Sequence, residues 1–339
     1  MTAWGWFVLP LAAFAFYWPY FPDGSAVKWF AVGLTALLAV NVRRLDIVDA
    51  VAVSIPVWAA LSAFWTTDPW GVMPGVLHLA ALSLVFVAAR RVDNFTPFLI
   101  AATVGLCAVI LSSHFHPVYQ GGFGNENFTT LFVIAALPLA AFLGGFAWAA
   151  VAVSFIYLLS ENGSRLELAA VAGWMAYWFL STPWTKRKAA ALAVLIVGFM
   201  VVAAVMLSRD TDGLGYRVDM WRAAVAMFMD SPLLGRGMGG YETDFLWFAP
   251  SAQTVVLYGQ HVYGPGSAHG DFLQVAAEFG VIGIAWLAVL IYALRKGPAW
   301  AWYAISGIFA CALVDAPFQL PATALIGVVA LGALVKKHA

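Results

Sequence analysis

The chain has 339 residues, of which 63% are hydrophobic and only 10% are charged. Soluble domains are typically about 25% charged, so the composition excludes an ordinary soluble protein and predicts a polytopic membrane protein. The formal net charge is zero, which excludes the basic surface of a nucleic-acid-binding protein. Both cysteines lie in apolar runs, where we expect neither a disulfide framework nor a metal site.

The hydropathy of the chain predicts an all-α fold with about twelve membrane spans, because one span needs roughly 20 apolar residues. We expect a single membrane domain over residues 1–339, with no internal repeat. The predicted spans lie near residues 3–20, 26–42, 47–65, 71–89, 95–113, 127–145, 146–161, 164–181, 188–207, 271–294, 298–315 and 318–335.

The basic residues predict the orientation of these spans, because Lys and Arg concentrate in cytoplasmic loops. Eleven of them follow even-numbered spans or lie at the C-terminus: Arg43, Arg44, Arg90, Arg91, Lys186, Arg187, Lys188, Arg295, Lys296, Lys336 and Lys337. Both termini are therefore expected in the cytoplasm. The remaining six are Lys28, Arg165, Arg209, Arg217, Arg222 and Arg236, which this topology places on the outer face.

One long segment, residues 208–270, lies outside the predicted spans and forms the large outer loop. Long loops in compact proteins are usually functional or disordered. Its first part, GYRVDMWRAAVAMFMD, repeats apolar residues at helical spacing, which predicts an amphipathic helix along the membrane surface. The apolar residues of this repeat are Val218, Trp221, Val225 and Phe228.

A glycine-rich stretch, SPLLGRGMGGYETDF, follows this helix and predicts a series of turns. Gly235, Gly237 and Gly240 match the pattern G-x-G-x-x-G. A dinucleotide site would need a strand before the pattern and a helix after it. An amphipathic helix precedes it here, so we interpret the glycines as a flexible backbone turn.

Outer-face arginines suit an anionic ligand, because the guanidinium fork grips phosphate oxygens and keeps its charge. Arg165 follows a predicted N-cap, Ser164, and a helix N-terminus with an arginine is a good anion site. Arg165 could instead snorkel or pair with Glu161. We interpret Arg217 as a ligand-binding residue at the start of the loop helix.

For two further arginines of the outer loop, the sequence gives weaker support for ligand binding. Arg222 is five residues after Arg217, roughly 140° around the helix, so the two do not share a face. Arg222 and Asp219 are spaced to form an ordinary ion pair. Arg236 lies among glycines and reaches either a ligand or solvent.

His269, Asp271 and Glu278 lie at the mouth of predicted span 271–294. A neutral histidine can take a proton from a sugar hydroxyl near pH 7; the alternative is a polar residue satisfied at a helix end. Asp271 with Gln274 resembles a capping box. Glu278 is seven residues after Asp271, which places it about 10 Å further along the helix. A carboxylate within the membrane predicts a functional role. The alternative is a structural ion pair between Glu278 and an outer-face arginine.

The segments YRVDMWRAAVAMFMDSPLLGRGMGGYE and AHGDFLQVAAEFGVIG together resemble the O-antigen ligase and polymerase superfamily of bacterial membrane glycosyltransferases. The upstream segments FGNENFTTLFVIAALPLA and SRLELAA also resemble it, so that the resemblance covers residues 121–294. One departure is Gly270, where the family often has asparagine after the histidine. The chain is also short for this superfamily, which suggests a small acceptor.

The resemblance implies a donor glycan on undecaprenyl diphosphate and transfer on the periplasmic side of the bacterial inner membrane, to a glycolipid or glycan acceptor. It implies that His269 is the base and that Arg165 and Arg217 hold the diphosphate. It implies neither a metal nor a nucleotide cofactor. We add Arg222, Arg236, Asp271 and Glu278 as expected binding or positioning residues, and we expect inversion at the anomeric carbon and apolar clefts that hold the prenyl chain.

Several functions remain open at this point. A ligase is favoured slightly, but a polymerase of O-antigen or exopolysaccharide and a protein O-oligosaccharyltransferase would use the same donor chemistry. A polytopic transporter or flippase is the alternative from a different class. Such a protein would show inverted repeats and broken helices near the middle of the membrane, whereas the charges here cluster at one face.

Overall fold

The computed structural model describes residues 45–115, 126–144, 174, 211–249, 256–258, 261–263, 265–294 and 297–335. The helices are α3 (Ile47–Leu61), α4 (Val72–Ala89), α5 (Thr96–Phe115), α6 (Glu126–Leu143), α10 (Thr211–Asp230), α11 (Gly240–Phe248), α12 (Asp271–Tyr292), α13 (Ala299–Ala312) and α14 (Pro321–Leu334). Short 3₁₀ turns are η2 (Ser62–Phe64) and η5 (Pro317–Gln319). The described chain is thus helical as expected, apart from a small antiparallel hairpin of β1 (Val256–Tyr258) and β2 (His261–Tyr263).

A helix occupies the position of each predicted span that the structure describes. Three helical segments are long and apolar enough to cross a membrane, namely Ile47–Phe64, Val72–Ala89 and Asp271–Tyr292. Four shorter apolar helices lie at Thr96–Ile110, Phe128–Leu143, Ala299–Ala312 and Pro321–Leu334. Predicted spans 3–20, 26–42, 146–161, 164–181 and 188–207 lie outside the described residues, apart from Trp174. The count of twelve spans and the cytoplasmic termini therefore remain predictions.

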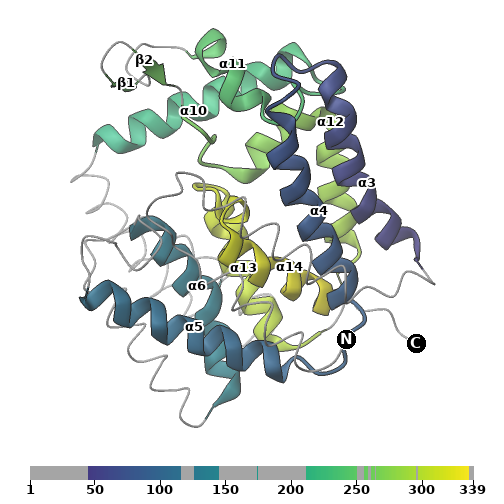
Figure 1. Ribbon diagram of the computed structural model, residues 1–339, viewed down its shortest axis with the longest axis vertical. Helices are drawn as coiled ribbons and strands as arrows, with labels where there is room; N and C mark the ends of the chain where they lie inside the picture. Colours follow the sequence, from purple (N-terminus) through teal and green to yellow (C-terminus); the bar gives the residue numbers. More distant parts are fainter. Residues whose placement is uncertain are drawn as a thin grey trace, which may run out of the picture.

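The helices form three groups around a central pair (Figure 1). α13 and α14 pack on each other and lie between α5 and α6 on one side and α3 and α4 on the other. α12 runs beside α3, and α10 and α11 lie across the top of the view with the hairpin. We call the end of the molecule that carries α10, α11 and the hairpin the loop end.

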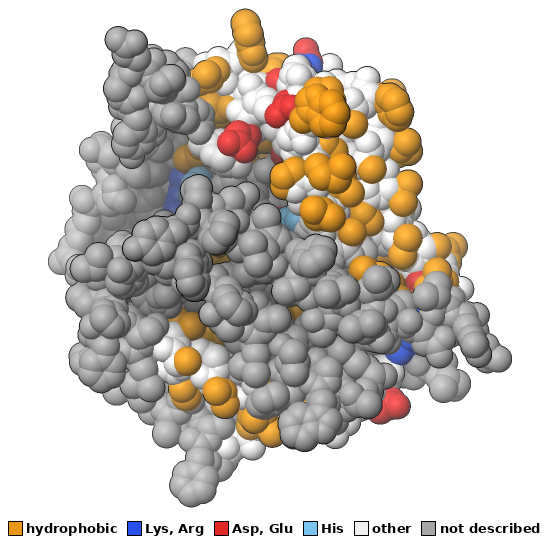
Figure 2. Space-filling view, in the orientation of Figure 1, with side chains coloured by type: hydrophobic (Ala, Val, Ile, Leu, Met, Phe, Trp, Pro, Cys, Tyr) orange, Lys and Arg blue, Asp and Glu red, His pale blue; other side chains and the backbone are white. Residues whose placement is uncertain are grey.

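The surface over α3, α4 and α12 is strongly apolar, as Figure 2 shows on the right of its view. Large aromatic side chains are exposed at both ends of these helices. Phe64 and Trp70 are exposed where α3 connects to α4, and Tyr292 is exposed at the opposite end of α12. Trp and Tyr side chains are enriched at the two membrane–water interfaces. This surface therefore has the character of one that faces lipid.

The loop helix α10 forms where the sequence predicts it, but a different stripe of residues packs against the protein. Its buried residues are Met220, Ala223, Ala224 and Met227, whereas Val225 of the predicted apolar stripe is 48% exposed. The buried stripe packs with Tyr241 and Phe245 of α11 and with Ala277 of α12 in a second small core. The phenol of Tyr241 donates a hydrogen bond to the carbonyl of Met220, and burial raises the pKa of this phenol.

The glycine-rich stretch docks on a break in α12. Gly280 has φ 59° and interrupts the helix. The carbonyls of Ala277 and Glu278 accept hydrogen bonds from the amides of Arg236 and Gly237, each at 2.9 Å. The loop thus satisfies polar groups of the broken backbone.

Close approach of the two backbones explains why glycines occupy this contact. Gly235 has φ 70°, and a Cβ on it would overlap backbone atoms of Glu278 and Phe279. A Cβ on Gly280 would overlap the backbone of Leu233. The predicted backbone turn is confirmed, whereas the predicted flexibility is not tested, and hydrogen bonds attach the turn to α12.

The opposite end of the bundle has a buried charge cluster. The side chain of Asp46 caps α3 by accepting hydrogen bonds from the amides of Val48 and Asp49. Arg90, at the end of α4, forms ion pairs with Asp46 and Asp49 and donates to the carbonyl of Val335. The hydrogen bond from Arg90 lowers the pKa of Asp46 well below its usual range. Arg90, predicted as a cytoplasmic flank, is therefore also a structural partner that ties α3, α4 and α14 together.

Candidate active site

His269 lies at the loop end in a constrained turn, one residue before the N-cap of α12. It is the one non-glycine residue in the described chain with positive φ, 44°. The indole N–H of Trp221 donates a hydrogen bond to its carbonyl at 3.0 Å. α10 thus fixes the backbone of His269 in a conformation that L-residues seldom adopt. Strained backbone of this kind clusters at functional sites.

Asp315 holds the imidazole of His269. It follows the end of α13, and its side chain is almost fully buried. Its Oδ1 atom is 3.1 Å from Nδ1 of His269, although the two residues are 46 positions apart in the chain. The same oxygen accepts a hydrogen bond from the amide of Ala316 at 2.8 Å, which fixes the orientation of the carboxylate.

Arg217 approaches the other oxygen of the same carboxylate. Its Nη2 atom is 3.5 Å from Oδ2 of Asp315, in an ion pair longer than a hydrogen bond. This Oδ2 is buried and has no hydrogen-bond partner among the described residues. Asp315 therefore brings Arg217 and His269 to one point, where an arginine, a histidine and an incompletely satisfied carboxylate share a partly exposed site.

The contact to Asp315 determines which imidazole nitrogen can react. We assign the Nδ1 proton of His269 to the hydrogen bond with Asp315, because a carboxylate accepts and does not donate. Nε2 then carries the lone pair, and among the described residues it has no hydrogen-bond partner. A histidine with one nitrogen held by a carboxylate and the other free of hydrogen bonds from the described residues has the arrangement of a general base.

The structure assigns Asp271 to a different contact from the capping box that the sequence predicts. α12 begins at Asp271 itself, with Gly270 as its N-cap and no side-chain cap. The Oδ2 atom of Asp271 instead accepts a hydrogen bond from the amide of Phe318 in η5, at 2.9 Å. Asp271 thus attaches α12 to the segment that follows Asp315, and the capping-box prediction is wrong.

Glu278 is also held by neutral groups rather than by an arginine. Its Oε1 accepts a hydrogen bond from the side-chain amide of Gln274 at 3.1 Å, and it receives further hydrogen bonds from the backbone of Gly239 and Tyr241. Within the described chain, neither Asp271 nor Glu278 forms a hydrogen bond or an ion pair with the side chain of His269 or of an arginine. Any positioning effect of these two carboxyls on His269 is therefore indirect.

Two arginines that the sequence proposes as ligands have protein partners. The exposed Arg222 pairs with Asp219 at 3.4 Å, as its spacing predicts. Arg236 pairs with Asp230 and with the buried Asp244, both at 2.7 Å. These ion pairs hold Arg236 within the loop end, and binding of a ligand by Arg236 stays a prediction. Arg165 lies outside the described residues.

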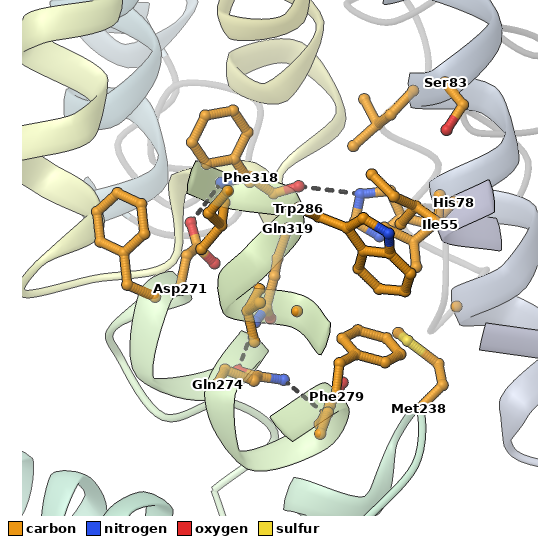
Figure 3. A pocket seen from close by; sticks show the side chains of 18 of the residues that line it. Ile55, His78, Ser83, Met238, Asp271, Gln274, Phe279, Trp286, Phe318 and Gln319 are labelled. Atoms are coloured by element: carbon orange, nitrogen blue, oxygen red, sulfur yellow. Dashed lines mark hydrogen bonds between the residues drawn. The ribbon is translucent and has the colours of Figure 1, made fainter. Parts of the chain in front are cut away.

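A cavity of about 650 Å³ lies between α4 and α12, close to the turn that carries His269. Its apolar walls come from α3, α4, α12 and α14. Figure 3 shows its polar end, where the backbone of Phe318 links the two sides. The carbonyl of Phe318 bonds to Nε2 of His78 on α4 at 2.9 Å, and its amide bonds to Asp271 on α12. Gln274 and Gln319 bond to each other at 2.7 Å beside it.

Comparison with known proteins gives one family. A family model described as O-antigen ligase matches residues 148–288. The match confirms the resemblance to the O-antigen ligase and polymerase superfamily. No match was found among curated proteins or among solved structures. The segment that the family model matches includes Arg217 and His269, whereas Asp315, which joins them, lies beyond it.

Asp315 is a functional candidate that the sequence did not single out. It is the last residue of predicted span 298–315. A single acidic residue at that position is easily interpreted as the polar end of a membrane span. The rule that a carboxylate at membrane depth predicts function selects Glu278, and it would also have selected Asp315.

Among the described residues no group of three metal-ligating side chains is present.

Proposed function

We propose that the protein transfers a glycan from undecaprenyl diphosphate to an acceptor hydroxyl on the periplasmic face of the bacterial inner membrane. The contact of His269 and Arg217 with the single carboxylate of Asp315 is the observation that carries this proposal. In this arrangement, His269 can deprotonate an acceptor hydroxyl and Arg217 can bind a phosphate group, and both lie at the loop end of a membrane protein. The O-antigen ligase match to residues 148–288 supports the same class of reaction.

The proposed reaction is a single displacement. Nε2 of His269 accepts the proton of the acceptor hydroxyl as its oxygen attacks the anomeric carbon of the donor sugar. The bond between that carbon and the diphosphate oxygen breaks, and undecaprenyl diphosphate leaves with the electron pair. His269 then releases its proton to water. Attack from the side opposite the leaving group inverts the anomeric configuration.

Each member of the site has a separate role in this step. Asp315 keeps the reactive tautomer of His269 and stabilises the imidazolium that forms during attack. Arg217 stabilises the negative charge that develops on the leaving diphosphate. Arg165 is proposed as the second diphosphate-binding arginine. Because these residues supply both the base and the charge stabilisation, we propose that the reaction needs no metal or cofactor.

The acceptor decides between a ligase and a polymerase, and a transfer assay separates them. The purified protein in vesicles would receive an undecaprenyl-diphosphate-linked repeat unit, with and without lipid A–core, in the presence of EDTA. Glycan on the lipid A–core is the result expected of a ligase. Longer lipid-linked glycan without that acceptor would identify a polymerase instead. Loss of all transfer on addition of EDTA would contradict a metal-independent reaction.

A further inference from the structure

Gln274 lies near the start of α12, and its side-chain amide takes part in three hydrogen bonds. Its Oε1 atom accepts one from the backbone amide of Ala268 at 3.1 Å and one from the side-chain amide of Gln319 at 2.7 Å (Figure 3). Its Nε2 atom donates one to Oε1 of Glu278 at 3.1 Å. Gln274 thus connects the turn before α12, the 3₁₀ turn η5 and the next turn of α12 itself.

The partners of Gln274 allow one orientation of its amide group. A backbone N–H can only donate, so the amide of Ala268 has to meet the oxygen of Gln274. The nitrogen of Gln274 then faces Glu278, whose carboxyl group has an accepting oxygen in either protonation state. A side chain at this position therefore has to accept on one side and donate on the other. Glutamine does both, whereas an apolar side chain of the same length does neither.

The bond to Ala268 fixes the turn that carries the proposed base. Ala268 is fully buried, so its backbone amide needs a partner within the protein, and Gln274 supplies that partner. On the other side of the turn, Trp221 donates a hydrogen bond to the carbonyl of His269. The two contacts therefore hold the chain before and after a residue with φ 44°. Such a backbone conformation persists only where the surrounding structure enforces it.

The bond to Gln319 fixes the same turn relative to the carboxylate that orients the imidazole. Gln319 is the last residue of η5, which begins two residues after Asp315. Asp271 also holds η5, through a backbone amide, but of these two residues only Gln274 also bonds to the turn before His269. A single oxygen atom of Gln274 therefore contacts both segments whose side chains form the contact between His269 and Asp315.

We infer that Gln274 is a positioning residue for His269, which keeps Nδ1 of the imidazole on Asp315 and leaves Nε2 free for the acceptor hydroxyl. The inference rests on the proposed function, because it concerns the base of that reaction. Gln274 contacts neither the sugar nor the phosphate in the proposed step and transfers no proton. Its role also goes beyond the local helix cap that the sequence predicts for this glutamine, because its oxygen joins two distant segments.

Gln274→Met removes the hydrogen bonds with little change in side-chain volume. A thioether is a weak acceptor, so kcat for transfer should fall about tenfold, while the KM values of donor and acceptor should stay within about twofold of the wild type. Gln319→Met removes the bond to η5 but leaves the acceptor of the Ala268 amide, so it should lower kcat by less than about threefold. Transfer by the full-length protein in vesicles measures both variants. A wild-type kcat for Gln274→Met, or an equal loss in the two variants, would overturn the inference.

A pair of double variants separates the accepting oxygen from effects on the loop end. Gln274→Glu with Glu278→Gln exchanges the two groups, so that an oxygen still faces the amide of Ala268 and the introduced amide can bond to the introduced carboxyl. Gln274→Met with Glu278→Gln has the same second substitution but no such oxygen. The first double variant should keep kcat within about threefold of the wild type, and the second should be about tenfold slower than the first. Equal kcat values for the two would contradict the inference.

The tautomer of His269 gives a readout that needs no transfer. Nitrogen NMR of the full-length protein with isotope-labelled histidines, at about pH 8 where an ordinary imidazole is neutral, distinguishes the two tautomers. The signal of His269 is the one that disappears in His269→Ala. We expect the Nδ1–H tautomer in the wild type and a mixture of tautomers in Gln274→Met.

The NMR result also separates failure of this inference from failure of the proposed function. An unchanged tautomer in Gln274→Met would contradict the inference, and transfer by the wild type would leave the proposed function intact. The expected change of tautomer, without transfer by the wild type to any acceptor, would contradict the proposed function and support the positioning of His269 by Gln274.

Discussion

Nδ1 of His269 lies 3.1 Å from Oδ1 of Asp315, and this contact joins the turn before α12 to the end of α13. It ties His269, which lies in the segment that the family model matches, to Asp315, which lies outside that segment. The backbone amide of Ala316 donates a hydrogen bond to the same carboxylate oxygen and fixes its orientation. The orientation of the proposed base therefore depends on a residue that contacts neither sugar nor phosphate in the proposed reaction.

Asp315→Asn should lower kcat for transfer by about 10²-fold or more, because the amide neither selects the reactive tautomer nor stabilises the imidazolium. Binding of undecaprenyl diphosphate and the melting temperature should change little, since the side chain keeps its size. Asp219→Asn is the matched control, because Asp219 pairs with the exposed Arg222 on the surface of α10. A variant Asp315→Asn with wild-type kcat would contradict the positioning role.

Arg217→Lys should raise the donor KM by about tenfold, because an ammonium cannot replace the two-pronged hydrogen bonding of a guanidinium to phosphate. Arg222→Lys on the same helix should leave KM unchanged, since Arg222 is exposed and already paired with Asp219. Steady-state kinetics at varied donor concentration measure both. Equal effects of the two variants would show that Arg217 has no special contact with the donor.

Gly235→Ala should destabilise the loop end by more than about 2 kcal/mol, because a Cβ at positive φ would overlap the backbone of Glu278. Gly266→Ala is the control, since a Cβ there has no atom within 4 Å. Thermal unfolding in detergent measures the difference. A wild-type melting temperature for Gly235→Ala would refute the proposed docking of the loop on α12.

The charge cluster at the far end predicts an acid-sensitive stability. Arg90 lowers the folded-state pKa of Asp46, so the ionised carboxylate stabilises the fold above the ordinary pKa of 3.8. That stabilisation is lost as the pH falls towards the lowered value. Asp46→Asn should therefore be less stable than the wild type at pH 6 and should lose less stability between pH 6 and pH 3. Parallel acid-dependent melting curves for the two proteins would disprove this role.

Much of the helical framework could be predicted from the sequence, because long apolar runs and the loop helix carry local signals. The described helices α3, α4, α5, α6, α12, α13 and α14 lie at predicted spans. The break in α12 could not be predicted in this way. A single glycine such as Gly280 inside an apolar run is compatible with a continuous helix, and the loop that satisfies the broken backbone is distant in sequence.

The site itself was partly predictable. The chemistry of His269 and Arg217 and the family resemblance both point to these two residues, but their common partner depends on the packing of α10, α12 and α13. The contact of Asp271 with Phe318 also depends on tertiary structure, and it overrides the local capping pattern. The glycine neighbours of Arg236 suggested an open position, although its partner Asp244 lies eight residues further along the chain.

The most direct test of the central claim is transfer by the reconstituted His269→Ala variant. The assay uses an undecaprenyl-diphosphate-linked repeat unit with EDTA present, and the control is His338→Ala, a substitution 69 positions from His269 in the sequence. We predict inverting transfer by the wild type and the control, and a loss of about 10²- to 10⁴-fold in His269→Ala with donor binding retained. Undiminished transfer by His269→Ala would show that His269 is not the base.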